Sequence, residues 1–406
     1  MKHPIILLDD SRQADLLPFT FTRPVWDLRM GIFTQKERWE ATLGSEVFTL
    51  AAGHLASVFT HLPSEKVVLT LNSGIFPDED LVRLIDSLDV DEYAVDSQGT
   101  WIAACVPLAT LISLKEPVDA DFWEEQGLRS LLDSHTHLSI RFPEDIFRYN
   151  AEAILRDFPL ATKAAPSQKL NDPHTRVYGQ DNLYLAPGAR VKAAIINAED
   201  GPIYLGPNST VSEGAIIVRS HAICDHATVA MGAKLRGDTT VGPWSKVGGE
   251  VSNSVLMAYS NKGHDGYLGN SVLGQWCNLG ADTNNSNLKN NYANVKLWHY
   301  PSGRFRDTGL QFCGLMMGDH SKCGINTMFN TGTVVGVSAN IFGQGFPRNF
   351  VPSFSWGGAS GFTTYQFGKA LEVARMVKDR RGKSFTQDEV ALMQAVFDKT
   401  AVYRRS

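Results

Sequence analysis

Apolar side chains recur at every sixth position through the middle of the chain. The longest unbroken run is formed by Leu205, Val211, Ile217, Ile223, Val229, Leu235, Val241 and Val247. Six residues suffice for one short strand and a corner, and three such sides close a coil that stacks on the next coil at about 4.8 Å. Shorter runs at the same step extend the array over roughly residues 181–346. The pattern predicts a parallel β-helix in which each coil buries its apolar residues against its neighbours.

Two stretches interrupt the six-residue step, at 248–266 and 282–310, and both contain glycines, asparagines and lysines. A β-helix accommodates insertions as loops that project from a corner, and such loops often form the binding face. We therefore expect the functional residues of this region in these two loops.

The chain follows other patterns on either side of the array. Ile5–Leu8 and Val67–Leu71 are short apolar runs suited to buried parallel strands, with a helical pattern after the second. Near the C-terminus, helical spacing at 363–381 is followed by a capping box of Thr386 and Glu389 ahead of another helix. The predicted domains are α/β at 1–165, a polar linker at 166–180, the β-helix at 181–360 and a helical cap at 361–406.

Composition narrows the class of protein. The chain has 406 residues, of which 43% are hydrophobic and 20% are charged, and no stretch approaches the ~18 apolar residues of a membrane span. The N-terminal apolar run is too short for a secretion signal, so we expect a cytoplasmic protein without membrane association. The net charge of -5 gives no global attraction for nucleic acid. Five scattered cysteines without a CxxC pair predict buried thiols rather than disulfides or a metal site.

Three segments in and after the interruptions carry a family resemblance: Gly263-His264-Asp265-Gly266-Tyr267-Leu268-Gly269, Asn278-Leu279-Gly280-Ala281, and Asn291-Tyr292 with Lys296. The six-residue period resembles the hexapeptide-repeat acyltransferases, which form a left-handed parallel β-helix. The three segments resemble the acetyltransferase half of the bifunctional, GlmU-like uridylyltransferase/acetyltransferases that make UDP-N-acetylglucosamine, and the whole chain resembles a short, alternative form of that family.

This resemblance implies roles for particular residues. His264 would be the general base that deprotonates the attacking amine, which suits a side chain with a pKa near 6.5. Ala281 would contact acetyl-CoA, the expected cosubstrate. The substrate would be bound by Lys262, Tyr267, Asn278, Asn291, Tyr292 and Lys296. The resemblance also implies a homotrimer.

The N-terminal segment Leu17–Pro24 resembles part of a sugar nucleotidyltransferase with a Rossmann-like α/β fold. Where that family has a glycine-rich phosphate loop, residues 9–15 contain no glycine, and Val25 stands where a phosphate-binding lysine is usual. Arg12, Arg23 and Arg29 are the candidates to replace these groups. We therefore predict weak or absent nucleotidyl transfer, with Mg²⁺ needed only if this domain is active.

The sequence thus predicts acetyl transfer from acetyl-CoA to an amino group of a sugar phosphate or nucleotide sugar, with an N-terminal domain that binds or forms a nucleotide sugar. Two alternatives remain open from the same features: nucleotidyl transfer as the main activity, and a catalytically silent trimeric scaffold. A third alternative, a metal-dependent hydratase, rests on the spacing of His221 and His226 and lacks a third histidine. No metal site is expected.

Overall fold

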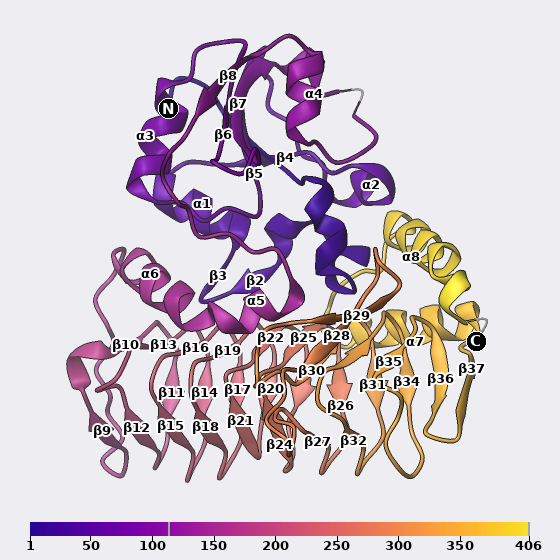
Figure 1. Cartoon of the computed structure of the whole chain (residues 1–406). Helices are drawn as coiled ribbons and strands as arrows, with labels where there is room; N and C mark the ends of the chain where they lie inside the picture. Colours follow the sequence, from indigo (N-terminus) through magenta and orange to yellow (C-terminus); the bar gives the residue numbers. More distant parts are fainter. Residues whose placement is uncertain (113, 405–406) are drawn as a thin grey trace. The chain divides into compact units, whose positions relative to one another are not determined.

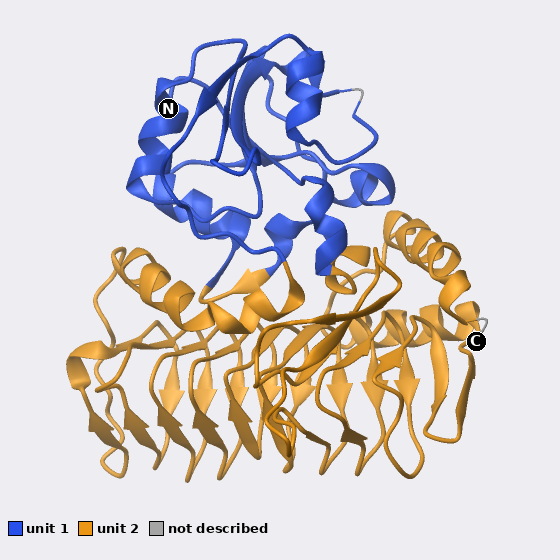
Figure 2. Cartoon of the chain, viewed as in Figure 1, with its two compact units in different colours: residues 1–16, 22–28, 33–141 blue, residues 17–21, 29–32, 142–406 orange. Residues whose placement is uncertain are grey.

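A computed structural model describes residues 1–112 and 114–404, and the chain packs into two compact units (Figure 2). Unit 1 contains Met1–Leu16, Thr22–Leu28 and Phe33–Arg141, and unit 2 contains Leu17–Phe21, Arg29–Ile32 and Phe142–Ser406. Among the described residues, no helix is both long and apolar enough to cross a bilayer. All five cysteines are buried and free, as expected.

Unit 1 is a six-stranded mixed sheet with short helices (Figure 1). Its strands lie in the order β4 (Phe48–Thr49), β1 (Ile5–Leu8), β5 (Val67–Asn72), β7 (Trp101–Pro107), β6 (Glu92–Val95) and β8 (Arg129–Leu132). Its helices are α1 (Gln35–Leu43), α2 (Ala56–Phe59), α3 (Glu79–Ser87) and α4 (Ala120–Glu125). The two predicted strands, β1 and β5, are parallel neighbours, whereas β7 runs antiparallel to β5 and β6. The predicted α/β fold is confirmed, with a mixed sheet.

Local chemistry fixes the elements of unit 1. All four residues of β1 are buried, as a strand with helices on both faces requires. The Asp78 carboxylate accepts a hydrogen bond from the Leu81 amide and so caps α3, whose Leu81 and Ile85 face the core.

Unit 2 is a three-sided parallel β-helix (Figure 1). Side 1 stacks β10 (Leu183–Leu185), β13 (Ile203–Leu205), β16 (His221–Ile223), β19 (Thr239–Val241), β22 (Val255–Ala258), β25 (Val272–Gln275), β30 (Leu315–Met317), β33 (Thr333–Val335) and β35 (Phe350–Val351). Side 2 stacks β11 (Arg190–Val191), β14 (Thr210–Val211), β17 (Thr228–Val229), β20 (Lys246–Val247), β23 (Asn261–Lys262), β26 (Asn278–Leu279), β31 (Lys322–Cys323), β34 (Asn340–Ile341), β36 (Ser355–Gly358) and β37 (Gly361–Thr364). Side 3 stacks β9 (Arg176–Tyr178), β12 (Ile195–Asn197), β15 (Ile216–Val218), β18 (Lys234–Arg236), β21 (Glu250–Ser252) and β24 (Tyr267–Gly269), and a separate pair, β27 (Asn284–Asn285) and β32 (Met328–Phe329), follows β24.

The register of the strands confirms the six-residue period. On side 1, Leu205 lies beside Ile223 and Ile223 beside Val241, so residues one coil apart stack directly. The other two sides repeat this arrangement with Val211 beside Val229, and Ile217 beside Leu235. Every residue of the unbroken run has no exposed surface, which makes the run the core of the β-helix.

The packing of the chain divides it differently from the expected domain boundaries. Strand β9 lies within the expected linker at 166–180 and pairs with β12, so the solenoid begins before residue 181. Helices α5 (Pro143–Arg148) and α6 (Asn150–Thr162) pack with unit 2 rather than with unit 1. The reason for α6 is polar: Asn150 Oδ1 accepts the Gly31 amide at 2.7 Å, and Asp157 accepts the Ile32 amide at 2.9 Å.

The C-terminal end of the solenoid is closed by a hairpin of β36 and β37, helices α7 (Phe367–Asp379) and α8 (Gln387–Lys399), and a final 3₁₀ turn at Ala401–Arg404. The capping box of Thr386 and Glu389 is present as predicted. Phe354, at the end of side 1, is fully buried against Phe367 and Phe397. From Phe354, α7 runs back along the corner between sides 1 and 2, where Lys378 lies over the Trp276 ring and Arg381 donates to the Trp244 carbonyl at 3.4 Å, so the helices cover several coils.

Candidate active site

His264 lies at the corner where the chain turns from β23 on side 2 to β24 on side 3, and it is exposed. The coils before and after present the turns at 248–249 and 280–283 at the same corner. The Gly248 amide donates to the Lys262 carbonyl at 2.7 Å, and the Asp282 amide donates to the Asp265 carbonyl at 3.1 Å. These backbone hydrogen bonds fasten the His264 turn on both sides.

The glycines beside this turn have a steric reason. Gly249 has a φ of +68°, and a Cβ there would lie 2.6 Å from the Gly266 carbonyl oxygen. Only glycine allows this close approach of the two coils. The predicted functional loop at 248–266 is therefore a tightly packed corner rather than a projecting loop.

Lys262 lies inside this corner and not at its surface. Its side chain is 1% exposed, and its Nζ donates to the carbonyls of Gly248 at 3.2 Å, Asp265 at 2.9 Å and His264. Burial lowers the pKa of Lys262 to about 8. An ammonium group has three donors, and all three are used here. The structure thus places Lys262 as a support of the His264 turn, in contrast to the substrate contact expected from the sequence.

Asn278 and Ala281 lie one coil beyond His264 at the same corner. In the ladder of side 2, Asn278 pairs with Asn261 on one side and with Lys322 on the other, and its side chain is exposed. Ala281 follows in the next turn, where its carbonyl accepts the Asn326 amide at 2.8 Å. The structure thus places Asn278 and Ala281 on the coil that follows His264.

Tyr267 begins β24 directly after the His264 turn. Its hydroxyl accepts a hydrogen bond from Asn287 Nδ2 at 3.0 Å, and burial raises its pKa. Asn285 fastens the same strand, because its side-chain amide bonds both the N–H and the C=O of Gly269. Asn285 and Asn287 were not singled out from the sequence, although both lie in its asparagine-rich stretch. Their side-chain amides supply hydrogen bonds to β24 that a neighbouring strand would otherwise make.

Asn291, Tyr292 and Lys296 do not join this edge within one chain. All three are exposed on the segment between β27 and β30, which leaves the solenoid at the other end of side 3, where it meets side 1. The substrate-binding residues that the resemblance implies are therefore not all gathered around His264 within one chain. The reason is the position of the insertion: it follows the strand on side 3, whereas His264 precedes that strand.

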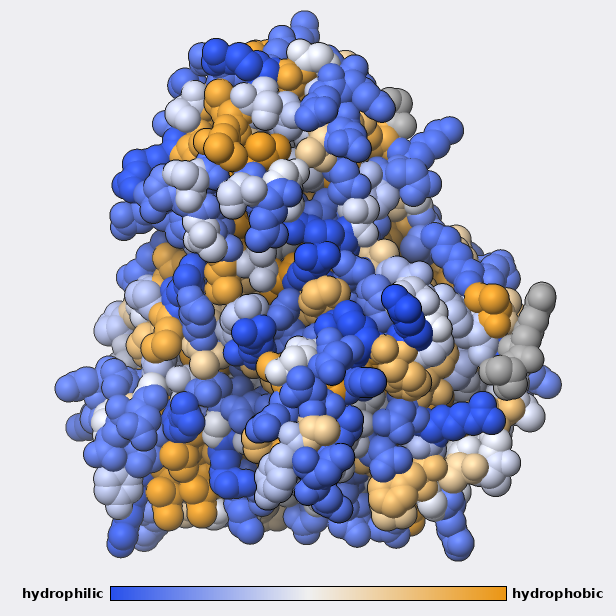
Figure 3. All heavy atoms as spheres, in the orientation of Figure 1, coloured by the Kyte–Doolittle hydropathy of each residue, from blue (hydrophilic) through white to orange (hydrophobic). Residues whose placement is uncertain are grey.

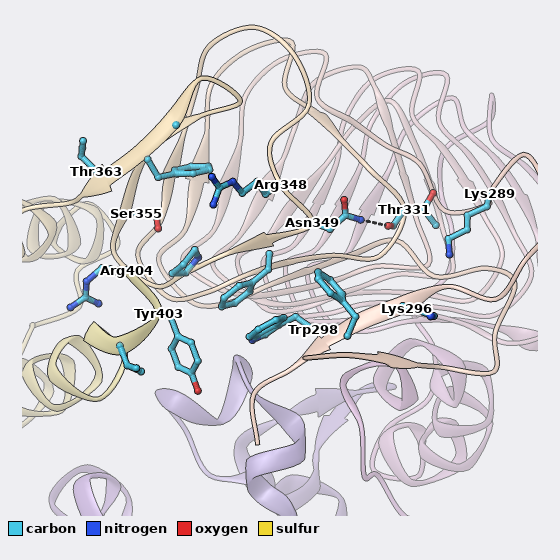
Figure 4. A pocket seen from close by; sticks show the side chains of 16 residues that line it. Lys289, Lys296, Trp298, Thr331, Arg348, Asn349, Ser355, Thr363, Tyr403 and Arg404 are labelled. Carbon is cyan, nitrogen blue, oxygen red and sulfur yellow. Dashed lines mark hydrogen bonds between the residues drawn. The ribbon is translucent and has the colours of Figure 1, made fainter. Parts of the chain in front are cut away.

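The loop contains a β-hairpin that the sequence did not predict, formed by β28 (Lys296–His299) and β29 (Arg304–Asp307). The Arg306 guanidinium pairs with Glu144 at 2.5 Å and lies over the Phe142 ring at 3.8 Å, which fixes the hairpin to the rest of unit 2. Lys296 lines a cavity of about 960 Å³ beside this hairpin (Figure 4).

The arginines proposed for phosphate binding lie in different places. Arg12 pairs with Asp10 at 2.6 Å and Arg23 pairs with Asp27, so each of these two guanidinium groups of unit 1 has a carboxylate beside it. Arg29 belongs to unit 2, where it is buried and donates to the Ile32 carbonyl. It is therefore not part of the N-terminal unit to which the sequence assigned it.

A 3₁₀ helix at Ser11–Leu16 occupies the place of the glycine-rich loop. Before it, at the carboxyl end of β1, Asp9 accepts hydrogen bonds from the Val25 amide at 3.0 Å and from the Ser73 hydroxyl. Burial raises the pKa of Asp9 to about 7. In α/β proteins, ligands bind at the carboxyl ends of the strands. Here the buried Asp9 carboxyl group at that position is hydrogen-bonded to an amide and a hydroxyl of the protein itself.

The two histidines behind the hydratase alternative do not form a site. His221 is fully buried, and its Nδ1 lies 3.0 Å from the Arg219 carbonyl oxygen. His226 is exposed at the next corner and stacks on Trp244, with 4.0 Å between ring centroids. Within residues 1–112 and 114–404, no group of three His, Cys, Asp or Glu side chains is arranged to hold a metal ion.

Comparisons with known proteins give one family match, in the N-terminal part of the chain, and several relatives that match part of its length. Residues 5–165 match the model of a family described as sugar nucleotidyl transferases. The protein is 31% identical over 198 residues to the bifunctional protein GlmU of Nocardia farcinica, covering 46% of this chain and 35% of that protein. It is 28% identical over 168 residues to a bifunctional sugar-1-phosphate nucleotidylyltransferase/acetyltransferase of Sulfurisphaera tokodaii, covering 41% and 39%. It is 24% identical over 294 residues to GlmU of Synechococcus elongatus, covering 69% and 57%.

Among solved structures, a UDP-N-acetylglucosamine acyltransferase from Campylobacter jejuni aligns with 55% of this chain and 94% of its own, at 12% identity and a TM-score of 0.22. The chain spans between about one third and just over half the length of the curated relatives it matches. The resemblance found in the sequence is thus confirmed: the chain is similar to sugar nucleotidyl transferases at its N-terminal end and to bifunctional nucleotidyltransferase/acetyltransferases over part of its length.

Proposed function

We propose that the protein transfers an acetyl group from acetyl-CoA to an amino group of a sugar phosphate or nucleotide sugar. The observation that supports this most is the His264 corner, where the backbone of the turn that carries the exposed His264 is held by hydrogen bonds with two neighbouring coils and with Lys262. Asn278 and Ala281 lie one coil away at the same edge. One relative, 28% identical over 168 residues, is a bifunctional sugar-1-phosphate nucleotidylyltransferase/acetyltransferase.

The chemistry requires one base and no metal. The amine attacks the thioester carbonyl, and the C–N bond forms as the C–S bond breaks. His264 accepts the proton lost by the amine and returns it to the leaving thiolate, so that the imidazole ends the cycle neutral. Asn278 is suited to orient the acceptor because its amide both donates and accepts hydrogen bonds.

The remaining substrate residues, Asn291, Tyr292 and Lys296, are supplied in this proposal by a second copy of the chain. This assembly is the homotrimer that the resemblance implies. Ile195 and Ile216, on neighbouring strands of side 3, are 41% and 36% exposed, and orange spheres mark this part of the solenoid in Figure 3. Contact with another copy would remove this apolar surface from water.

For unit 1 we propose binding of a nucleotide sugar with weak or no nucleotidyl transfer. The pairing of Arg12 and Arg23 with carboxylates and the 3₁₀ helix at Ser11–Leu16 support this. The measurement is pyrophosphate release from UTP or dTTP with sugar 1-phosphates and Mg²⁺. Rapid turnover would favour the alternative in which nucleotidyl transfer is the main activity.

The central test is acetyl transfer from acetyl-CoA to a panel of amino sugar phosphates and nucleotide-linked amino sugars. General-base catalysis contributes ~10²- to 10⁴-fold, so His264→Ala should lower kcat by that factor and leave KM for acetyl-CoA nearly unchanged. His174→Ala, at an exposed histidine near the first coil, is the matched control. Wild-type turnover by His264→Ala would overturn the mechanism, and no transfer to any acceptor would favour the silent scaffold.

A further inference from the structure

Within one chain, the cavity beside the hairpin β28–β29 lies apart from the His264 corner. Its volume of about 960 Å³ is within the range of small-molecule sites. The walls come from the hairpin, the last coils of the solenoid and the final 3₁₀ turn, all within unit 2 (Figure 4). His264, Asn278 and Ala281 are not among its lining residues.

The charged residues that line this cavity are all cationic. Its lining includes Lys289, Lys296, Arg348 and Arg404, and it includes no Asp or Glu among the described residues. Arg404 is occupied by the carbonyls of Ser353 and Phe397, and Lys289 by that of Asn294. The side chains of Lys296 and Arg348 are exposed and make no hydrogen bond or ion pair within the described residues, although Asp307 is the cross-strand neighbour of Lys296. Two cationic side chains without an ion-pair partner at one cavity suit a phosphate-bearing ligand.

Aromatic rings form another part of the wall. Trp298 stacks on Phe350 with ring centroids 4.2 Å apart, and Phe305 meets its edge at 5.5 Å. The Trp298 indole nitrogen is buried without an acceptor among the described residues. Phe305 is 43% exposed and offers a ring face at the cavity. A planar base can stack on such a ring.

We propose that this cavity binds a nucleoside diphosphate group, with the phosphates between Lys296 and Arg348 and the base against Trp298 and Phe305. The Arg306–Glu144 ion pair holds the hairpin in place, so that the site is formed before the ligand arrives. A nucleotide sugar and coenzyme A both carry such a group. Within one chain the site does not include His264; it shares Lys296 with the substrate residues proposed above, which another copy would bring to that corner.

The test is calorimetric titration of the full chain with UDP, ADP, coenzyme A, uridine and inorganic pyrophosphate at constant ionic strength. We expect a diphosphate-bearing nucleotide to bind more tightly than uridine or pyrophosphate. Arg348→Ala and Phe305→Ala should each weaken that binding about 10-fold or more. Comparison of the affinities for UDP, ADP and coenzyme A identifies which of these nucleotides the cavity binds.

Both changed side chains are largely exposed, and circular dichroism checks that the variants fold. Arg304→Ala, on the same hairpin but outside the cavity lining, should leave Kd unchanged, and so should His264→Ala. Binding in unit 1 would be insensitive to Arg348→Ala, which separates this inference from the function proposed above. Unchanged nucleotide binding in both cavity variants, or pyrophosphate binding as tightly as UDP, would overturn the proposal.

Discussion

The surroundings of two buried histidine side chains shift their pKa values in opposite directions. Burial lowers the pKa of His221 to about 4, whereas burial of His137 is outweighed by Asp78 and Asp133, which lie 2.7 and 2.6 Å from its ring nitrogens and raise its pKa. His137 therefore stabilises unit 1 most below its unfolded pKa near 6.5, and this contribution is lost as the pH rises through its folded pKa.

In unit 2, His221 makes the stability depend on pH in the opposite direction. The unfolded chain takes up a proton at about pH 6.5 and the folded chain only near pH 4, so acidification favours unfolding. Between pH 7 and 4.5 we expect wild type to lose about 2 kcal/mol more stability than His221→Gln. Urea unfolding followed by circular dichroism at the two pH values measures this difference, and parallel losses in both proteins would contradict it.

Lys262 is the residue whose role the sequence misjudged most. We expect Lys262→Met to cost about 1–3 kcal/mol, because three carbonyls at the corner lose their donor. The turn that carries His264 should exchange its amide hydrogens faster, and kcat should fall. Lys246→Met, on the exposed face of the neighbouring strand, is the control. Unchanged exchange at 263–266 would show that Lys262 does not position the turn.

At the scale of elements, the cap of the solenoid depends on a few aromatic contacts. The Phe397 ring lies 5.0 Å from Phe354 and 5.1 Å from Phe367, and the Arg404 guanidinium lies over it at 4.2 Å. Phe397→Ala should destabilise unit 2 by about 2–3 kcal/mol, less than a fully buried ring, and lower its Tm. Met376→Ala, exposed on α7, should leave Tm unchanged, and equal Tm values for both variants would contradict this role of the cap.

The sequence predicted the solenoid well because every coil repeats one physical requirement, a buried apolar residue at each side. For the same reason it placed the segments of His264 and Asn278 on neighbouring coils, but Asn291, Tyr292 and Lys296, expected in the same substrate site, lie at another corner. It failed where contacts depend on distant segments. Lys262 is buried because its ammonium group bonds carbonyls of the preceding coil and of its own turn. Helix α6 packs with unit 2 because its side chains accept the amides of Gly31 and Ile32.

At the scale of the whole molecule, the separation of Lys296 from the His264 edge gives a direct test of a shared site. If one copy supplies His264 and another the loop, His264→Ala and Lys296→Ala chains are each inactive alone. Random mixing should restore about one quarter of the wild-type activity per site, because that fraction of interfaces combines two intact halves. Light scattering checks for a trimer. Mixed trimers without activity would contradict the shared site.

The chain passes between its two units after residues 16, 21, 28, 32 and 141, rather than through a single linker. Residues 29–32 reach the solenoid as a separate segment, where Gly31 and Ile32 satisfy Asn150 and Asp157, both of which have no exposed surface. A gene fragment that begins at residue 142 would remove the Gly31 amide from Asn150, which keeps its hydrogen bonds with Thr240 and Asp238, and would remove the Ile32 amide from Asp157. A single cut at residue 142 therefore divides unit 2, and one recombination event at that point would not exchange whole units.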